Sequence, residues 1–385
     1  MTADGESRDA AVDRVRSALA DAAVGRDVLY ASLTDLDAAT VSLDGHTVRV
    51  TISLPVPHEG VRAALERDVQ AAVGDLDGVS SVTVDWRPAA ADRGERVDLI
   101  PDVKNVVAVA SGKGGVGKST VAVNLATALA DAGAAVGLLD ADVYGPNAPK
   151  MLGLSDATPA TTRGDDIVPR EAHGVRVMSM GFVVGEDDPV IWRGSMVADL
   201  ITQFVDDVAW GDLDYLVVDL PPGTGDAQMT LVEHLPVAGA VLVTTPQDVA
   251  VDDARLGLEQ FARYGVPVLG IVENMHQFEC PDCGEGHAIF GEGGARSLAE
   301  EYNVPVLAEL PLDPMVGVHE RDEDERGVSI PVVGRVAMPR TREERERGGR
   351  LPPVSLREDG GEVRDALRLA ATRTAARLDQ LAVGE

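Results

Sequence analysis

Seven short apolar runs, separated by helix-length segments, constrain the fold of this 385-residue chain more than any other feature. Each run is nearly continuous in apolar residues, whereas a strand with one solvated face would alternate. Such runs are typical of a parallel sheet covered by helices on both faces. The runs are Val106–Ala110, Ala135–Leu139, Val175–Met180, Tyr215–Leu220, Ala240–Thr244, Val268–Val272 and Val306–Leu310. We therefore predict a doubly wound, mostly parallel α/β domain over residues 105–333.

Residues 1–87 predict a separate, smaller α/β domain ahead of this sheet. Ser7–Val24 and Val61–Val73 have the helical spacing of apolar residues. Thr47–Leu54 and Val79–Trp86 alternate like strands with one solvated face. We expect the order αββαβ for this unit.

Charged stretches that contain proline flank the predicted sheet domain. Residues 88–104 have no sustained apolar period and are predicted to be the linker between the two domains. Residues 334–361 are predicted to form a charged loop rich in proline and glycine. Residues 362–385 are expected to hold a final helix, Glu362–Ala382.

The chain is strongly acidic, with 64 acidic residues against 34 basic ones and a net charge of −30. Such a surface repels phosphate, so general nucleic-acid binding is not expected. No run of about 18 apolar residues occurs and no secretory signal is recognisable, so we expect a cytoplasmic protein without stable membrane association. Strong acidity combined with scarce lysine resembles the proteins of salt-loving archaea. The four lysines are Lys104, Lys113, Lys118 and Lys150.

A glycine-rich loop follows the first apolar run and leads into a helical run. Its sequence, SGKGGVGKST, contains the phosphate-loop pattern G-x-x-x-x-G-K-[ST] in the strand–loop–helix setting that this pattern requires. Glycines let backbone N–H groups turn toward phosphate oxygens, the Lys118 ammonium reaches the β- and γ-phosphates, and the Ser119 hydroxyl binds Mg²⁺. The chain is therefore expected to bind a nucleoside triphosphate. The predicted binding residues are Gly112, Lys113, Gly114, Gly115, Val116, Gly117, Lys118, Ser119 and Thr120.

A second lysine, Lys113, lies early in this loop of a chain that otherwise uses arginine. The pattern KGGVGKS resembles the deviant Walker A motif of the class that contains MinD, Mrp and the nitrogenase iron protein. The resemblance implies that Lys113 reaches across a dimer to the phosphates bound by the other subunit. Lys113 and Lys118 are both expected to take part in hydrolysis.

Carboxylates follow two of the predicted strands, where parallel sheets hold their ligands. Asp140 and Asp142 follow the second run, and Asp219 opens the sequence DLPPGTGD after the fourth. By the same resemblance, Asp142 orients the attacking water and takes part in hydrolysis with Asp219. Asp140 and Asp219 are expected to bind Mg²⁺ together with Ser119. Asp219–Asp226 resembles the switch segment that senses the γ-phosphate.

The two cysteines, Cys280 and Cys283, form one C-x-x-C motif. Thiolates three positions apart on a tight turn both reach one soft metal centre. A [4Fe–4S] cluster needs four thiolates, so one pair per chain requires two subunits. The residues alone favour zinc equally, held with His276, His287 or a second subunit's cysteines. A dithiol switch and inert core thiols rank below both.

Residues 105–331 resemble the Mrp-type P-loop ATPases, which carry iron–sulfur clusters. The matching segments are SGKGGVGKST, LLDADVYGPN, VVDLPPGTGDAQMTL, TTPQDVAVDDAR, and GIVENM followed by C-x-x-C and IFGEGGA. The resemblance implies ATP, Mg²⁺ and a [4Fe–4S] cluster that bridges two subunits through Cys280 and Cys283. It also implies that Asn274 contacts adenine and that Pro311–Asp313 packs on the base.

The activity implied by this resemblance is that of a homodimeric ATPase that transfers a cluster to recipient apoproteins, with a cluster donor as a further candidate partner. Hydrolysis is expected to be slow, because a carrier uses ATP as a switch. The N-terminal unit is similar to a small domain often fused ahead of Mrp ATPases. No cysteine precedes Cys280, so this unit is expected to offer a docking surface rather than a thiol.

A MinD-like positioning ATPase that acts at a membrane is an alternative from another class, beside a zinc-bridged dimeric ATPase. It would use a basic amphipathic tail helix, and Glu362–Ala382 does carry several arginines. The apolar face of this helix is mostly alanine and leucine, without an aromatic anchor. We therefore expect it to pack against the ATPase core. Its arginines include Arg364, Arg368, Arg373 and Arg377.

Overall fold

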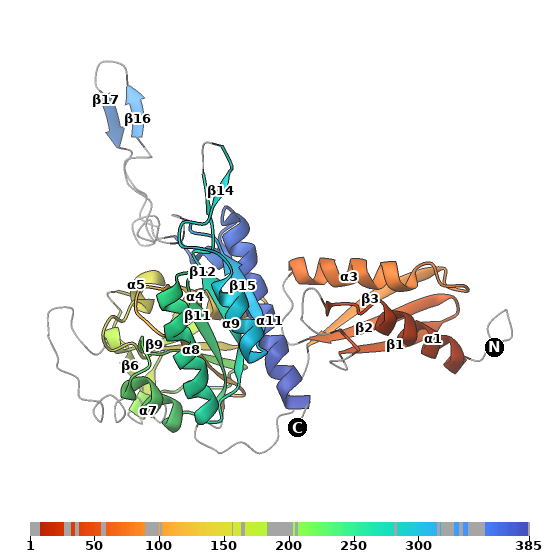
Figure 1. Ribbon diagram of the computed structural model, residues 1–385, viewed down its shortest axis with the longest axis horizontal. Coiled ribbons are helices and arrows are strands. Elements are labelled where there is room, and N and C mark those ends of the chain that lie inside the picture. Colours follow the sequence, from red (N-terminus) through yellow and green to blue (C-terminus); the bar gives the residue numbers. More distant parts are fainter. Residues whose placement is uncertain are drawn as a thin grey trace.

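The chain forms two α/β units in a computed structural model, with helix α11 (Gly361–Val383) lying between them (Figure 1). Ala376 of this helix packs into the core of the N-terminal unit, while other apolar residues of α11 pack into the larger one. The structure describes residues 8–26, 32–34, 38–54, 59–88, 100, 102–155, 157–162, 166–182, 203–204, 207–280, 283–313, 316, 327–330, 334–337 and 351–383.

The N-terminal unit has a three-stranded sheet and two helices in the predicted αββαβ order. Strands β1 and β2 are antiparallel, and β2 and β3 are parallel. One face of the sheet is buried because alternate residues of β2, including Val48 and Ile52, are fully covered. The position of β1 was not predicted. The elements are α1 (Arg8–Asp21), β1 (Ala39–Asp44), β2 (Thr47–Leu54), α3 (Glu59–Val73) and β3 (Ser81–Pro88).

An eight-stranded sheet forms the centre of the second unit, in the order β15-β12-β11-β4-β10-β5-β9-β8. Every neighbouring pair is parallel except β8 and β9, so the predicted fold class is confirmed. Each of the seven predicted runs overlaps a strand of this sheet, and three of them extend one residue beyond it. The strands are β4 (Val106–Ala110), β5 (Val136–Asp140), β8 (Arg170–Ala172), β9 (Val175–Ser179), β10 (Tyr215–Asp219), β11 (Val237–Thr244), β12 (Val268–Asn274) and β15 (Val306–Leu310).

Helices cover both faces of this sheet, which explains why its strands are apolar on both sides. In β4, Val107 and Val109 face one helical layer, and Val106 and Ala108 face the other. The first layer contains α4 (Lys118–Asp131), α5 (Ala148–Met151) and α11. The second contains α7 (Asp226–His234), α8 (Asp248–Arg263) and α9 (Gly294–Tyr302).

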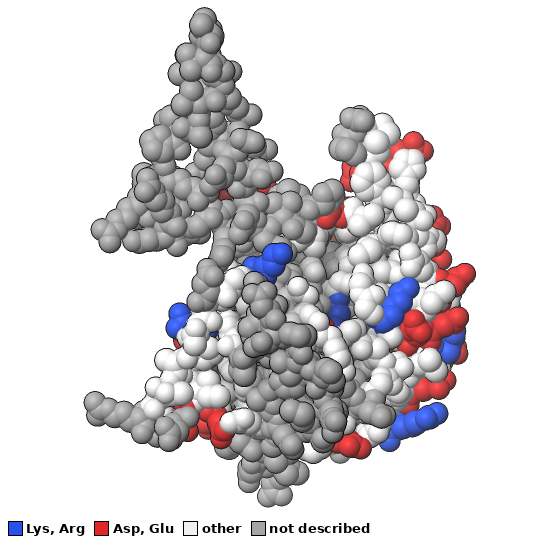
Figure 2. Space-filling view, turned by 90° about the vertical axis from the view of Figure 1, so that its left-hand side faces the viewer, with Lys and Arg blue, Asp and Glu red and all other residues white. Residues whose placement is uncertain are grey.

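Charged side chains occupy the outside of these layers. On the face drawn in Figure 2, acidic side chains gather toward the right-hand edge, and the described basic side chains stand apart from one another. No continuous basic stripe is therefore visible among the described residues of this face.

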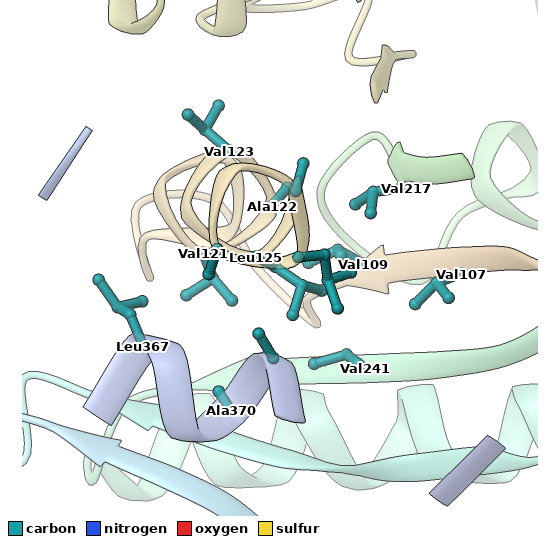
Figure 3. Close-up of a cluster of buried hydrophobic side chains, with 14 of the residues drawn as sticks. Val107, Val109, Val121, Ala122, Val123, Leu125, Val217, Val241, Leu367 and Ala370 are labelled. Atoms are coloured by element: carbon teal, nitrogen blue, oxygen red, sulfur yellow. The ribbon is translucent and has the colours of Figure 1, made fainter. Parts of the chain in front are cut away.

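Helix α11 packs against α4 and β15, as expected for the final helix. Leu367 and Ala370 contact the same apolar cluster as Val121 and Leu125 of α4 (Figure 3). Arg368 adds an ion pair with Asp131, at 2.6 Å. No helix among the described residues is long and apolar enough to cross a membrane.

Short hairpins extend from the second unit. Strands β13 (Phe278–Glu279) and β14 (Gly286–His287) flank the cysteines and project beyond the sheet in Figure 1. The described parts of the predicted 334–361 loop include a strand and a 3₁₀ turn, because Gly334–Ala337 pairs with Gly327–Ile330. Most of the predicted 88–104 linker and residues 338–350 lie outside the described residues. The remaining elements are β6 (Ala160–Thr161), β7 (Ile167–Val168), η1 (Met180–Phe182), β16 (Gly327–Ile330), β17 (Gly334–Ala337) and η4 (Val354–Leu356).

Candidate functional site

The glycine-rich loop joins β4 to α4 at the carboxyl edge of the parallel sheet, where α/β folds bind ligands. It lines a cavity of about 390 Å³. The positive end of the α4 dipole points toward this loop, which favours a phosphate group. The lining residues are Ser111, Lys113, Gly114, Gly115, Gly117, Lys118, Ser119, Thr120, Asp142, Asn147, Lys150, Met151 and Pro222.

Gly117 shows why this loop needs glycine. Its φ of 91° lies in the left-handed region, and a Cβ atom there would lie 2.2 Å from Nδ2 of Asn274. Asn274, at the end of β12, donates from Nδ2 to the carbonyl oxygen of Val116, at 2.9 Å. The loop is therefore held against the end of β12 by a hydrogen bond that a larger residue at 117 would break.

Lys118 is buried between two of the predicted carboxylates. Its Nζ donates to Oδ1 of Asp219 at 2.6 Å and lies 3.4 Å from Oδ2 of Asp142. Burial raises the pKa of the Asp219 carboxyl, although the Lys118 charge opposes the shift. This arrangement brings together the predicted phosphate-binding lysine and two predicted acidic residues.

The donor set around Asp219 suits Mg²⁺. Among the described residues, the buried Oδ2 of Asp219 has no hydrogen-bond partner. The Ser119 hydroxyl lies beside the same carboxylate and helps to lower its pKa. An unpartnered carboxylate oxygen next to a hydroxyl provides the hard oxygen ligands that Mg²⁺ prefers.

Asp140 and Asp142 have different surroundings. Asp142 lines the cavity. Both oxygens of Asp140 accept hydrogen bonds, Oδ1 from the amide of Asp142 and Oδ2 from the amide of Ala148 and the hydroxyl of Ser179. Burial and the neighbouring charge of Asp219 raise the pKa of Asp140 to about 7. Asp140 thus holds the Asp142 loop and the start of α5 in place, and its predicted role in the Mg²⁺ shell stays a prediction.

Lys113 lines the cavity and contacts its own chain. Its Nζ donates to Oε1 of Gln247, the residue before α8, at 3.2 Å. The predicted switch segment is tied to the same loop, because the amide of Gly223 donates to the carbonyl oxygen of Ser111 at 2.9 Å. The predicted contact of Lys113 with a second subunit would require it to leave Gln247.

The predicted base-binding residues lie at the ends of β12 and β15. The side-chain Nδ2 of Asn274 donates to the loop, so its side-chain oxygen, Oδ1, is the atom left to contact a base. In Pro311–Asp313, the amide of Leu312 donates to the carbonyl oxygen of Gln277 at 2.8 Å. The segment predicted to pack on the base is therefore bonded to the residue that begins the cysteine hairpin.

The C-x-x-C motif occupies the tip of the β13–β14 hairpin. Cys280 is half-buried, Cys283 is exposed, and no disulfide joins them. The amide of Cys280 donates to the carbonyl oxygen of Glu285, and the amide of Gly284 donates to that of Cys280. Gly284 has a φ of 70°, which closes this tight turn. The motif is thus presented on a folded turn that is accessible from solvent.

Glu273 fastens both ends of the hairpin segment to the sheet. This fully buried residue lies in β12. Its Oε1 lies 2.7 Å from Nδ1 of His276, and its Oε2 accepts from the amide of Ala295 at 2.8 Å. His276 precedes the hairpin and Ala295 follows it. One carboxylate therefore holds the chain where it leaves the body and where it returns.

The predicted zinc alternative within one chain is not assembled among the described residues. The group of three close metal-ligating side chains there consists of Glu273, His276 and Glu309, and it contains neither cysteine. Glu309 also pairs with Arg296 through both carboxylate oxygens. These bonds stabilise the hairpin base rather than completing a site at the cysteines.

Several residues at the site were not predicted from the sequence. Gln247 and Glu273 act through contacts that depend on how separate strands and helices meet, so no local pattern marks them. Lys150 lines the cavity, and its one sequence signal is that lysine is rare in this chain.

Family models match most of both units. Residues 102–334 match the ParA model, described as NUBPL iron-transfer P-loop NTPase. Residues 13–86 match the model of an iron–sulfur cluster assembly protein. The two matches together cover the N-terminal unit and the sheet domain.

Curated relatives carry the name iron–sulfur cluster carrier protein. One from Pseudomonas fragi is 53% identical over 63% of this chain and 86% of its own length. Another, from Synechocystis sp., is 48% identical over 79% of this chain and 87% of its own length. A nucleotide-binding protein from Archaeoglobus fulgidus, solved in complex with ADP and with cobalt, shares 40% identity at a TM-score of 0.51. This similarity covers 57% of this chain and 86% of that protein.

Proposed function

The chain belongs to the family of NUBPL iron-transfer P-loop NTPases, and from this premise we propose that it binds and hydrolyses ATP and carries an iron–sulfur cluster to recipient apoproteins. The observation that carries the proposal is that one chain has both a phosphate cavity and a cysteine pair at a hairpin tip, with Cys283 exposed and Cys280 half-buried. A carrier must both bind and release its cluster. Two cysteines on a hairpin tip that solvent reaches suit both steps.

The cargo is a [4Fe–4S] cluster that two chains share. Each chain supplies Cys280 and Cys283, and four thiolates complete the cluster. The hairpin supports this proposal because its tip is accessible and no third cysteine exists in the sequence. A two-fold dimer brings two identical hairpins together.

ATP acts as a slow switch for this dimer. Lys118 and the loop amides bind its phosphates, Ser119 and Asp219 hold Mg²⁺ with Asp140 behind them, and Asp142 orients the attacking water. Mg²⁺ supplies charge neutralisation at the phosphates when bound. Lys113 leaves Gln247 and binds the phosphates of the partner subunit. The 3.2 Å bond between Lys113 and Gln247 supports this step, because a single bond is readily exchanged.

The setting of this activity is the cytoplasm of a salt-loving archaeon. The net charge of −30 supports this setting, because a strongly acidic protein stays soluble where high salt screens its charges. The N-terminal unit offers a docking surface to a cluster donor or a recipient, and the match to assembly proteins supports this role.

Anaerobic reconstitution with iron and sulfide tests the cargo. The chain should bind about four irons per dimer, and Cys283→Ala should abolish this binding while leaving ATP affinity unchanged. His287→Ala is the matched control from the same hairpin and should keep the cluster. Stoichiometric zinc without sulfide, lost in both variants, would instead favour the zinc-bridged dimer. Retention of the cluster by Cys283→Ala would reject the assignment of these thiols.

A further inference from the structure

The distribution of lysine points to an additional residue at the nucleotide site. The chain has four lysines, and its other basic side chains are arginines. Three of the four lysines, Lys113, Lys118 and Lys150, line the phosphate cavity. Lys113 and Lys118 belong to the loop motif, whereas Lys150 lies in α5, more than thirty positions along the chain.

The Lys150 ammonium is available for a ligand. The other three lysines have partners: Lys104 with Asp214, Lys118 with Asp219, and Lys113 with Gln247. Lys150 is exposed, and no hydrogen bond or ion pair engages its ammonium group within the part of the chain that the structure describes. A cation on the wall of a cavity built for phosphate is positioned to pair with an anion there.

The position of Lys150 indicates which phosphate of the nucleotide it would contact. A phosphate-loop lysine contacts the β- and γ-phosphates, and Lys118 lies 3.4 Å from Asp142. The Asp142 end of the cavity therefore faces the γ-phosphate. Lys150 lines the same cavity as Asp142, while Asn274, predicted to contact the base, does not. One carboxylate ties Asp142 to the helix of Lys150, because Asp140 accepts from the amide of Asp142 and from the amide of Ala148 at the start of α5.

We propose that Lys150 binds the γ-phosphate of ATP and thereby makes the site prefer ATP over ADP. The inference rests on the proposed ATP binding and is independent of the cluster. This contact links α5 directly to the nucleotide. Asp140 holds the start of the same helix, because its Oδ2 accepts from the Ala148 amide at 3.1 Å. The segment between Asp142 and Lys150 then reports whether the third phosphate is present.

Equilibrium binding to a non-hydrolysable ATP analogue and to ADP tests the proposal at a constant molar salt concentration. Lys150→Ala should weaken binding of the ATP analogue by about fivefold to tenfold and of ADP by less than about twofold. Lys150→Arg should restore most of the preference, because it keeps the charge. Lys104→Ala is the matched control, since Lys104 lies outside the cavity and pairs with Asp214.

Lysine acylation read by mass spectrometry provides a second measurement on the unaltered chain. The ATP analogue should protect Lys150 more than ADP does, and the reactivity of Lys104 should not change. An equal loss of affinity for both nucleotides in Lys150→Ala, or equal protection by both, would overturn the proposal. If the unaltered chain bound neither nucleotide, the proposed ATPase function would fail instead.

Discussion

The nucleotide cavity and the cysteine hairpin differ in how completely one chain builds them. Around the phosphate loop, Lys118, Asp219 and Asn274 are buried, and each is bonded to another of them or to the loop. At the hairpin tip, Cys283 is exposed, and the described side-chain bonds gather at the base around Glu273. A rigid site binds a ligand with little reorganisation. The cysteine pair is less enclosed, with Cys283 exposed and Cys280 half-buried, and under the proposed function a second chain or a recipient completes it.

Glycines with positive φ provide the sharpest test of this difference. Gly117→Ala should destabilise the fold by about 3 kcal/mol and abolish ATP binding, because its Cβ would lie 2.2 Å from Asn274. Gly284→Ala meets only the Glu279 side chain, at 3.6 Å, and should cost about 1 kcal/mol of backbone strain. Calorimetry of unfolding and nucleotide titration measure both. Equal losses of ATP binding would contradict the contrast.

Removal of the carboxylate at the hairpin base should have the next largest effect. Glu273→Ala leaves the Ala295 amide buried without its acceptor and should lower the free energy of unfolding by about 2–3 kcal/mol. Hydrogen exchange should rise over residues 277–293 more than over the glycine-rich loop. Glu285→Ala, an exposed carboxylate in the same hairpin, is the control and should change neither. Uniform exchange across both regions would show that Glu273 does not act locally.

Lowering the pH should stabilise the surroundings of Asp140 behind the cavity and destabilise the base of the cysteine hairpin. Burial raises the pKa of Asp140 to about 7 from 3.8, so its contribution to stability is full below about 3.8 and is lost as the pH rises through 7. Hydrogen bonds from Arg296 lower the pKa of Glu309 below 4.5, so its contribution is present above 4.5 and is lost on further acidification.

Residue-resolved hydrogen exchange should therefore show β5 becoming more protected as the pH falls from 8 to about 6, after correction for intrinsic rates. The base of the hairpin should open only below about pH 4.5. Arg296→Gln should remove the acid sensitivity of the hairpin base and leave that of β5 unchanged. Loss of protection in both regions over the same pH range would contradict these assignments.

The contact between Lys113 and Gln247 should give the smallest effect. Gln247→Ala removes one exchangeable hydrogen bond and should change stability by less than about 1 kcal/mol. If ATP forms the proposed dimer, this substitution should raise the dimer fraction by about twofold, because it frees Lys113 for the phosphates of the partner subunit. Light scattering at several protein concentrations measures this fraction. Leu256→Ala is the control, because Leu256 is exposed on α8, the helix that Gln247 precedes. A weaker dimer in Gln247→Ala would contradict the proposed exchange.

Local patterns were sufficient to predict the main sheet and the phosphate loop. Continuous apolar runs arise because β4 is covered on both faces, and the SGKGGVGKST segment must follow a strand and begin a helix to present its amides. The edge strand β8, Arg170–Ala172, was missed because three residues with one polar face have no clear period. Strand β1 was not located although Ala39–Asp44 alternates regularly between more and less covered residues, a period from which it could have been predicted.

The sequence by itself determined which residues are the candidates for the chemistry: the loop lysines, the acidic strand ends and the single cysteine pair. Tertiary structure decided their arrangement, because contacts between distant strands set which carboxylate faces the cavity. Asp142 and Asp140 differ by two positions, yet one lines the cavity and the other accepts three hydrogen bonds behind it. Glu273 and Lys150 likewise gain their roles from neighbours that only the folded chain brings together.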